Sequence, residues 1–257
     1  MDDRYSQAAR WIFALCFIAM GVLGLVYGDF AMQWQPVPTG VAARTALAYV
    51  CAVLEIILGV SLLVPRYAAA ASRALVVYVL LWWLLLKVPG IVSAPSVEAS
   101  WLGLGEIAVI LAGAWTLSLL FGRADGPDTI SLRRAALLFG LALIPIGLSH
   151  IFYPTETAAL VPSWLPSHRG VAYATGAAQL AAGLGVLFWV LPSLAATLEA
   201  VALSIFTIFV WVPGLFGHPA RLQWTAVVMS SMITAGAWAA AAGVAFRHRA
   251  QRAHANT

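Results

Sequence analysis

The sequence predicts an all-α integral membrane protein with eight transmembrane helices, arranged as two four-helix units in parallel repeat. Of the 257 residues, 62% are hydrophobic and only 9% are charged, whereas soluble domains carry about 25% charged residues. Eight apolar runs reach or approach the length of a membrane span, and the last four runs echo the first four. No stretch between them is long enough to build a soluble domain.

The eight predicted spans follow one another with short breaks. Because a span needs about 20 predominantly apolar residues, we place them at residues 11–28, 44–64, 73–92, 101–121, 135–153, 170–191, 195–216 and 223–246. The breaks contain Pro, Gly, Arg and Asp, as in QWQPVPTG, VPRY and FGRADGPDTISLRR, and these residues are typical of turns. The first run lacks a clear small-residue cleavage site after it, so we expect a span there and not a removed signal peptide.

The positions of Lys and Arg predict the orientation. Ten arginines lie on the side of the N-terminus and three on the opposite side, and Lys87 falls within a span. The ten are Arg4, Arg10, Arg66, Arg73, Arg123, Arg133, Arg134, Arg247, Arg249 and Arg252, and the three are Arg44, Arg169 and Arg221. By the positive-inside rule, both termini are expected in the cytoplasm and the protein in the cytoplasmic (plasma) membrane. The basic C-terminal tail is expected to anchor on lipid headgroups, and no nucleic-acid partner is expected.

Four short segments recur in the same order at an offset of 123 or 124 residues. They are GLVYGDF (24–30) with GLSHIFY (147–153), AYVCAVLEIILGV (48–60) with AYATGAAQLAAGLGV (172–186), KVPG (87–90) with WVPG (211–214), and AGAW (112–115) with AGAW (235–238). A constant offset indicates an internal repeat. Each copy holds four spans, an even number, so both copies start on the same side of the membrane. We therefore predict units at residues 1–121 and 135–257, joined by a cytoplasmic linker at 122–134.

Ionisable residues within the predicted spans mark a candidate site in the first unit. An ionisable side chain in a span costs at least about 2.5–3.5 kcal/mol, so it needs a partner or a function. Glu55, Lys87 and Glu106 are all placed in the outer half of the membrane. Two interpretations stay open: a structural ion pair of Lys87 with Glu106 or Glu55, or a polar cavity that binds a ligand or handles a proton.

The second unit replaces Lys87 by Trp211 and Glu106 by Met229. Its equivalent cavity is therefore expected to be aromatic and neutral. Such a pocket suits a quinone ring or another flat hydrophobic molecule, with His150 or Gln179 as the hydrogen-bonding group. The histidines lack the spacing of known metal motifs, so no metal site is predicted.

The order GLSHIF, LVPSWLP and GVAYATGAAQLAAGLGVLF, at 147–152, 160–166 and 170–188, resembles the DoxX-like family of small four-helix membrane proteins. The resemblance covers roughly residues 136–246, with 12–121 as a more divergent copy. The family often has Glu where this unit has Gln179, and the first unit keeps Glu55 at that place. The resemblance implies a redox neighbourhood, because related proteins are linked to quinone-coupled sulfur oxidation or to thiol–disulfide maturation.

The leading functional hypothesis is a membrane component of a redox or quinone-linked process. Its outward-facing small-molecule pocket would be formed by Glu55, Lys87, Glu106, His150, Gln179 and Trp211. The chain has no CxxC motif and hence no built-in dithiol centre, so a quinone would be a bound ligand and a redox protein a partner. Two alternatives stay open: a non-catalytic carrier or binding protein for a small lipophilic or weakly acidic solute, and a structural membrane subunit. Whether the chain is an enzyme is left undecided.

Overall fold

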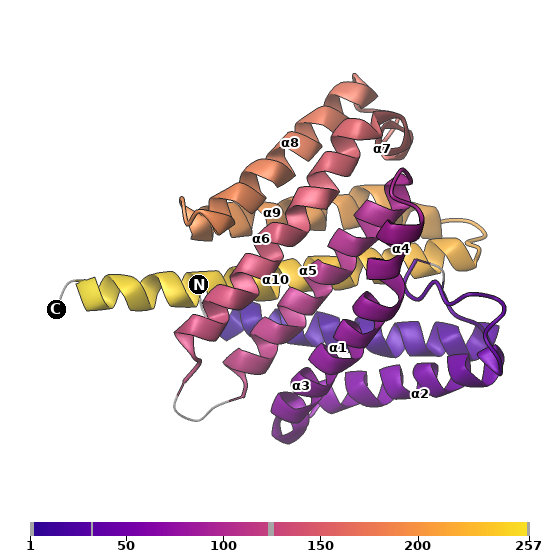
Figure 1. The fold of residues 1–257 in the computed structure, drawn as a ribbon, viewed down its shortest axis with the longest axis horizontal. Coiled ribbons are helices and arrows are strands. Elements are labelled where there is room, and N and C mark those ends of the chain that lie inside the picture. Colours follow the sequence, from indigo (N-terminus) through magenta and orange to yellow (C-terminus); the bar gives the residue numbers. More distant parts are fainter. Residues whose placement is uncertain (1–2, 32, 123–125, 256–257) are drawn as a thin grey trace.

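The computed structural model describes residues 3–31, 33–122 and 126–255, which are helical or loop without a strand (Figure 1). The helices are α1 (Asp3–Tyr27), α2 (Arg44–Leu63), α3 (Pro65–Trp82), η1 (Trp83–Lys87), α4 (Val88–Ser93), α5 (Glu98–Leu120), α6 (Thr129–Phe152), α7 (Pro154–Leu160), α8 (His168–Leu187), α9 (Pro192–Phe206), η2 (Thr207–Trp211), η3 (Val212–Leu215) and α10 (Arg221–Ala255).

The predicted fold class is confirmed. Within the described residues, eight helical stretches are long and apolar enough to cross a membrane. They are Arg4–Tyr27, Arg44–Leu63, Pro65–Ser93, Glu98–Leu120, Thr129–Phe152, His168–Leu187, Pro192–Leu215 and Arg221–Gln251. The chain is therefore an all-α, membrane-embedded protein.

Two spans begin earlier than their apolar runs because of local capping. α3 starts at Pro65, eight residues before the predicted span, since proline at the first helical position needs no backbone donor. α6 starts at Thr129 because the carboxylate of Asp128 accepts from the Ile130 amide at 3.0 Å and from the Ser131 hydroxyl at 2.6 Å. Residues 129–134 of the expected linker are thus the first turns of a span.

The third and seventh spans each contain a π-helical segment followed by a proline. η1 precedes Pro89 and η2 precedes Pro213. A proline has no N–H to donate and its ring crowds the preceding turn, so the helix widens there. Such π segments are frequent at functional sites, and Lys87 and Trp211 are the last residues of these two.

The two termini lie at the same end of the molecule, at the left in Figure 1. We call it the termini end; Arg133 near the start of α6 donates to the carbonyl of Leu187 at the end of α8 there. The opposite end, called the loop end, carries the α1–α2 loop and the starts of α5 and α10. There the Tyr153 hydroxyl donates to the carbonyl of Ser96, just before α5, at 2.7 Å.

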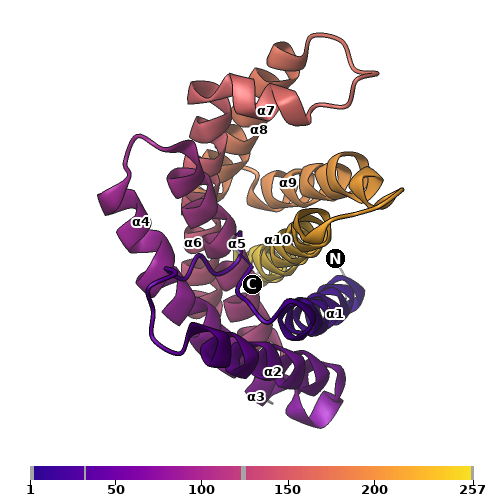
Figure 2. The ribbon, with the colours of Figure 1, turned by 90° about the vertical axis from the view of Figure 1, so that its right-hand side faces the viewer.

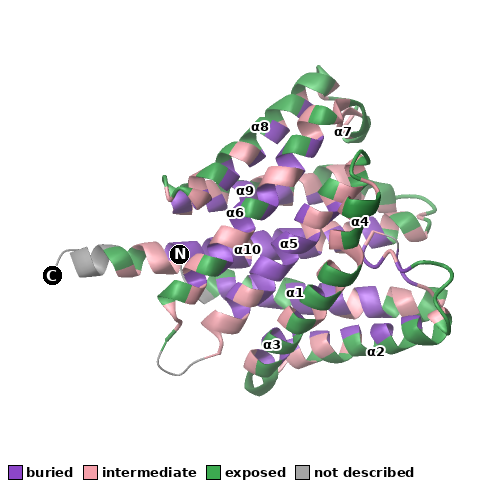
Figure 3. Ribbon diagram, in the orientation of Figure 1, coloured by how far each residue is buried: buried purple, intermediate pink, exposed green. Residues whose placement is uncertain are grey.

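The core is formed by α5 and α10, which are the most buried helices in Figure 3. They cross where the two AGAW segments meet: a Cβ placed on Gly113 would lie 2.4 Å from the Cα of Gly236. Only glycine permits this approach. α10 also packs between α1 and α9, as Figure 2 shows, and α5 packs on α6. The two predicted units are therefore joined by a continuous apolar core.

Helix bounds and local backbone recur 124 residues apart. α2 and α8 each have 20 residues, and each is preceded by a residue with positive φ, Ala43 at 52° and Ser167 at 53°. The preceding connections differ, because the described residues of 28–43, all but residue 32, hold no helix, whereas α7 lies between α6 and α8. Because the connections differ, the polar residues of the two halves have different neighbours.

Candidate functional site

The α1–α2 loop, residues 28–43, turns back into the loop end of the bundle. Trp34 and Gln35 are only 1% and 3% exposed, although they lie between two spans. Their backbone amides donate to the carbonyl of Ala31 at 3.0 and 2.7 Å, which makes a tight turn. The indole and the side-chain amide are thereby held inside the protein.

Glu55, on α2, is 2% exposed and meets these loop side chains. Its Oε1 accepts a hydrogen bond from Trp34 Nε1 at 2.7 Å and one from the Tyr78 hydroxyl at 2.8 Å. Gln35 Nε2 donates to the same hydroxyl oxygen at 2.8 Å. A buried carboxyl group needs protein donors in place of water, and the loop and α3 supply them. We call these four residues the Glu55 network.

Three consecutive loop residues are attached to the spans. Lys87, at the end of η1, donates from Nζ to the carbonyl oxygen of Gln33 at 2.9 Å. The next two residues, Trp34 and Gln35, reach α2 and α3 through the Glu55 network. Each such bond contributes about 0.5–1.5 kcal/mol net, and up to about 3 kcal/mol where a charged group takes part. The loop is therefore a fixed part of the bundle.

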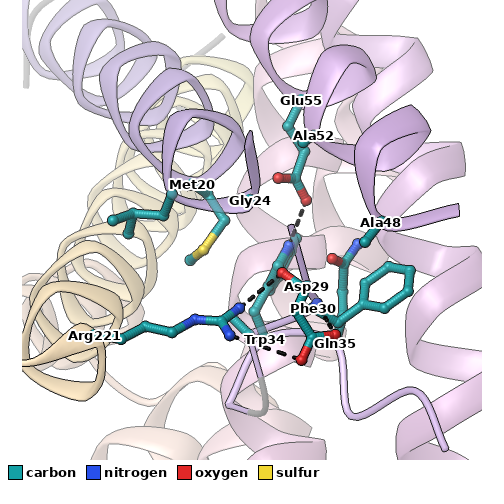
Figure 4. A pocket seen from close by; sticks show the side chains of 12 residues that line it. Met20, Gly24, Asp29, Phe30, Trp34, Gln35, Ala48, Ala52, Glu55 and Arg221 are labelled. Carbon is teal, nitrogen blue, oxygen red and sulfur yellow. Dashed lines mark hydrogen bonds and ion pairs between the residues drawn. The ribbon is translucent and has the colours of Figure 1, made fainter. Parts of the chain in front are cut away.

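A cavity lies beside Glu55 and opens toward the loop end (Figure 4). Its lining includes Met20 of α1, Ala52 of α2 and Arg221 of α10. With its open mouth the cavity has about 270 Å³, and the space for the centres of water molecules is about 10 Å³, room for about one water. Glu55 Oε2 makes no hydrogen bond to the described residues and lies on the side of Met20 (Figure 4).

Asp29 and Arg221 line this cavity, and Arg44 pairs with Asp29. We call these three residues the mouth cluster. Asp29 Oδ1 is paired with Arg44, and Arg221 approaches Asp29 Oδ2 at 3.8 Å and donates to its backbone carbonyl at 2.7 Å. The Arg221 guanidinium also lies over the Tyr27 ring, 4.9 Å from its centroid. Two guanidinium groups face one carboxylate, so the mouth cluster carries a net positive charge.

The three residues predicted to share one site in the first unit are separated. Glu55 lines the cavity, whereas Lys87 and Glu106 do not. Lys87 and Glu106 act on each other electrostatically, but no ion pair within 4.0 Å joins Lys87 to Glu106 or Glu55 in the described chain. The charge of Lys87 is directed at the carbonyl of Gln33 instead.

The second-unit candidates are spread over two places. His150 Nδ1, in the last turn of α6, is 3.4 Å from Thr175 Oγ1 of α8. Gln179, one turn farther along α8, lies beside Glu199 of α9. Trp211, at the end of η2, makes no hydrogen bond to either residue within the described chain.

Glu199 is a residue of the second unit that the sequence analysis does not predict as part of a site. It is 2% exposed, in the second turn of α9, so an ionisable group is buried where an aromatic and neutral cavity was expected. Its sequence signal was available, since it lies inside the predicted span 195–216. Trp34, Gln35 and Arg221 had no such signal, because they lie in or beside predicted breaks.

Comparison of the chain with family models, with curated protein sequences and with solved structures gives no match. The resemblance to the DoxX-like family therefore stays a prediction. The functional argument depends on the chemistry of the site.

Proposed function

We propose that the chain is a non-catalytic membrane carrier or binding protein for a small, weakly acidic solute. The observation that carries this proposal is the state of the Glu55 carboxyl group. One of its oxygens accepts two hydrogen bonds, while the other faces a small cavity below a positively charged mouth. The first oxygen fixes the group in place, and the second is free for a proton or a ligand.

The mouth cluster supports an anionic or weakly acidic solute. Arginine guanidinium groups bind carboxylates through paired, planar hydrogen bonds. Asp29 already occupies this position between Arg44 and Arg221, and it leaves one positive charge uncompensated. A solute carboxylate is therefore attracted to the mouth and competes with Asp29 for the guanidinium groups.

Glu55 supports coupling of the solute to a proton. A solute carboxylate held at the mouth cluster lies on the same small cavity as Glu55, and two neighbouring carboxylates share a proton because like charges disfavour double ionisation. Glu55 Oε2 is the position open to that proton, since Oε1 is already occupied by two donors. Binding of the solute then takes one proton with it.

The quinone-linked redox role, the leading hypothesis from the sequence, fits this cavity poorly. Its closed part has room for about one water, so a quinone ring would stay at the mouth. The donors beside it on Trp34, Tyr78 and Gln35 are already used within the Glu55 network, and Arg221 donates to Asp29.

We further propose an outward-facing cavity and an origin by duplication. The ten-to-three distribution of arginines supports cytoplasmic termini, which would place the loop end and the mouth cluster outside the cytoplasm. The equal bounds of α2 and α8 at an offset of 124 support two copies of one four-helix unit.

Ligand-dependent thermal unfolding in detergent tests the function. Acetate, lactate and benzoate are the probes, and benzamide is the neutral control for benzoate. We expect at least one acid to raise the melting temperature, since a ligand at 100 times its Kd adds about 2.7 kcal/mol of stability, whereas benzamide has no effect.

Glu55→Gln is the matched variant, because its amide oxygen can still accept from Trp34 and Tyr78. We expect it to fold and to lose most of the acid-dependent shift. An equal shift in Glu55→Gln, or no shift with any acid, contradicts the proposal. Stabilisation by decylubiquinone alone would favour the redox hypothesis instead.

A further inference from the structure

The second half holds a buried polar pair that the proposed function does not use. Gln179 of α8 and Glu199 of α9 are each 2% exposed, and neither lines the cavity beside Glu55. The Gln179 side chain lies beside the Glu199 carboxyl group, at the contact between α8 and α9. Even so, two buried oxygens have no partner: Gln179 Oε1 and Glu199 Oε1.

Two buried oxygens of this pair lack a hydrogen-bond donor, and this lack indicates what the pair can bind. Each is an acceptor, and a buried acceptor without a donor costs about 1–3 kcal/mol. The amide N–H groups of Gln179 can donate to the carboxyl, but its Oε1 only accepts. No rearrangement of these two side chains supplies a donor for both oxygens as long as the carboxyl is ionised. The pair is short of one hydrogen.

We propose that the Gln179–Glu199 pair is a proton-binding site, in which Glu199 is held as a carboxylic acid whose Oε1–H donates to Gln179 Oε1. A proton from water joins Oε1, and an amide N–H of Gln179 donates to the second carboxyl oxygen. The acid and the amide then form a ring closed by two hydrogen bonds. One proton satisfies both orphaned oxygens.

A proton fits this place better than a metal cation. Calcium takes six to eight oxygen ligands and magnesium demands an octahedral set. Here the described residues provide two free oxygens at a contact between α8 and α9. A proton needs only two oxygens, which is what the pair offers.

Other ionisable groups on the packed helices lie toward the helix ends. Glu199 has no other ionisable residue on α9, where Ser193 Oγ is 3.1 Å from His248 Nδ1 of α10. On α8 the titratable residues are within the first six, and on α10 they lie at its two ends. These residues are His168, Arg169 and Tyr173 of α8, and Arg221 and Arg247–Arg249 of α10. On α6, which packs against α8, Arg133 and Arg134 lie near the start and His150 near the end, with His150 Nδ1 directed at Thr175. Within the described residues, no salt bridge joins Glu199 to a cation.

The inference is independent of the proposed function, since it concerns a different carboxyl group. Infrared difference spectroscopy of purified protein at pH 7 tests it, with the spectrum of Glu199→Gln subtracted from that of the wild type. We expect the difference to contain the C=O band of a protonated carboxylic acid. The Glu55→Gln variant retains that band, which separates this outcome from the fate of the Glu55 proposal.

Gln179→Leu is the second variant and keeps the test valid should Glu199→Gln fail to fold. Removal of the amide frees the acid C=O from its hydrogen bond, so the band moves to higher frequency. Carboxylate bands in place of the acid band at pH 7 would overturn the proposal. So would a difference spectrum that responds to exchange of NaCl for choline chloride, which would identify a cation site.

Discussion

Position 55 on α2 and position 179 on α8 lie at the same place in two helices of equal length, yet their surroundings differ. Glu55 is surrounded by donors from Trp34 and Tyr78. Gln179 meets another acceptor, Glu199, and leaves two oxygens without a partner. The position in the span therefore determines where a polar group is buried, whereas the residues around the group determine what it can do.

The connecting segment explains the difference. In the first half the α1–α2 loop folds inward, so that Trp34 is 1% exposed. In the second half the corresponding connection contains α7, and its tryptophan, Trp164, is 67% exposed. The first half thus brings donors from a loop to its buried carboxyl group, and the second half does not.

The largest expected effect separates these two tryptophans. Trp34→Ala removes a fully buried ring and a donor to Glu55, so we expect a loss of about 3–5 kcal/mol in the free energy of unfolding. Trp164→Ala is the matched control in the other half, with an expected change below about 0.5 kcal/mol. Thermal unfolding in detergent measures both. A loss in Trp34→Ala as small as the loss expected for Trp164→Ala would show that the inward loop of the first half does not stabilise the protein.

A smaller effect is expected within the Glu55 network. Tyr78→Phe removes a hydroxyl that donates to Glu55 and accepts from Gln35, and we expect a loss of about 1.5–3 kcal/mol. Tyr67→Phe, on the same helix and 46% exposed, is the control and is expected to change stability by less than about 0.5 kcal/mol. If both variants have the same melting temperature as the wild type, the network contributes no stability.

The smallest effect concerns the mouth cluster. Asp29→Asn removes the carboxylate that competes with a solute for Arg44 and Arg221. Exposed ion pairs contribute about 0.2–1 kcal/mol, so we expect weak acids to bind up to about fivefold more tightly and added salt to weaken that binding. The affinities come from ligand-dependent melting.

Glu156→Gln is the control for the mouth cluster, because it removes a carboxylate from α7 in the other half. It is expected to leave the affinities unchanged. Weaker binding in Asp29→Asn would mean that Asp29 itself holds the solute.

Much of the fold could be predicted from the sequence, because span length and apolar runs are local properties. The eight spans were found, and the early starts of α3 and α6 follow from Pro65 and Asp128, which are also local. Glu55 was singled out as a buried carboxyl group for the same reason. Its partners were not, since Trp34 is 21 residues away in a loop without periodicity.

The mouth cluster shows a further limit of sequence reasoning. Arg221 donates to Asp29 across 192 residues, and both residues lie in breaks where charge is ordinary. One of the two open interpretations paired Lys87 with a carboxylate, but a backbone carbonyl of the inward loop accepts its hydrogen bond. Contacts of this kind depend on how a loop folds over the helix ends.

Uptake of radiolabelled lactate into proteoliposomes under an inward proton gradient is the most direct test of the carrier form of the proposal, with protein-free liposomes to measure passive leakage. We predict uptake above this leakage for the wild type and for Glu156→Gln, and uptake equal to the leakage for Glu55→Gln. Wild-type uptake in Glu55→Gln would contradict the role of Glu55 as the proton-exchanging group.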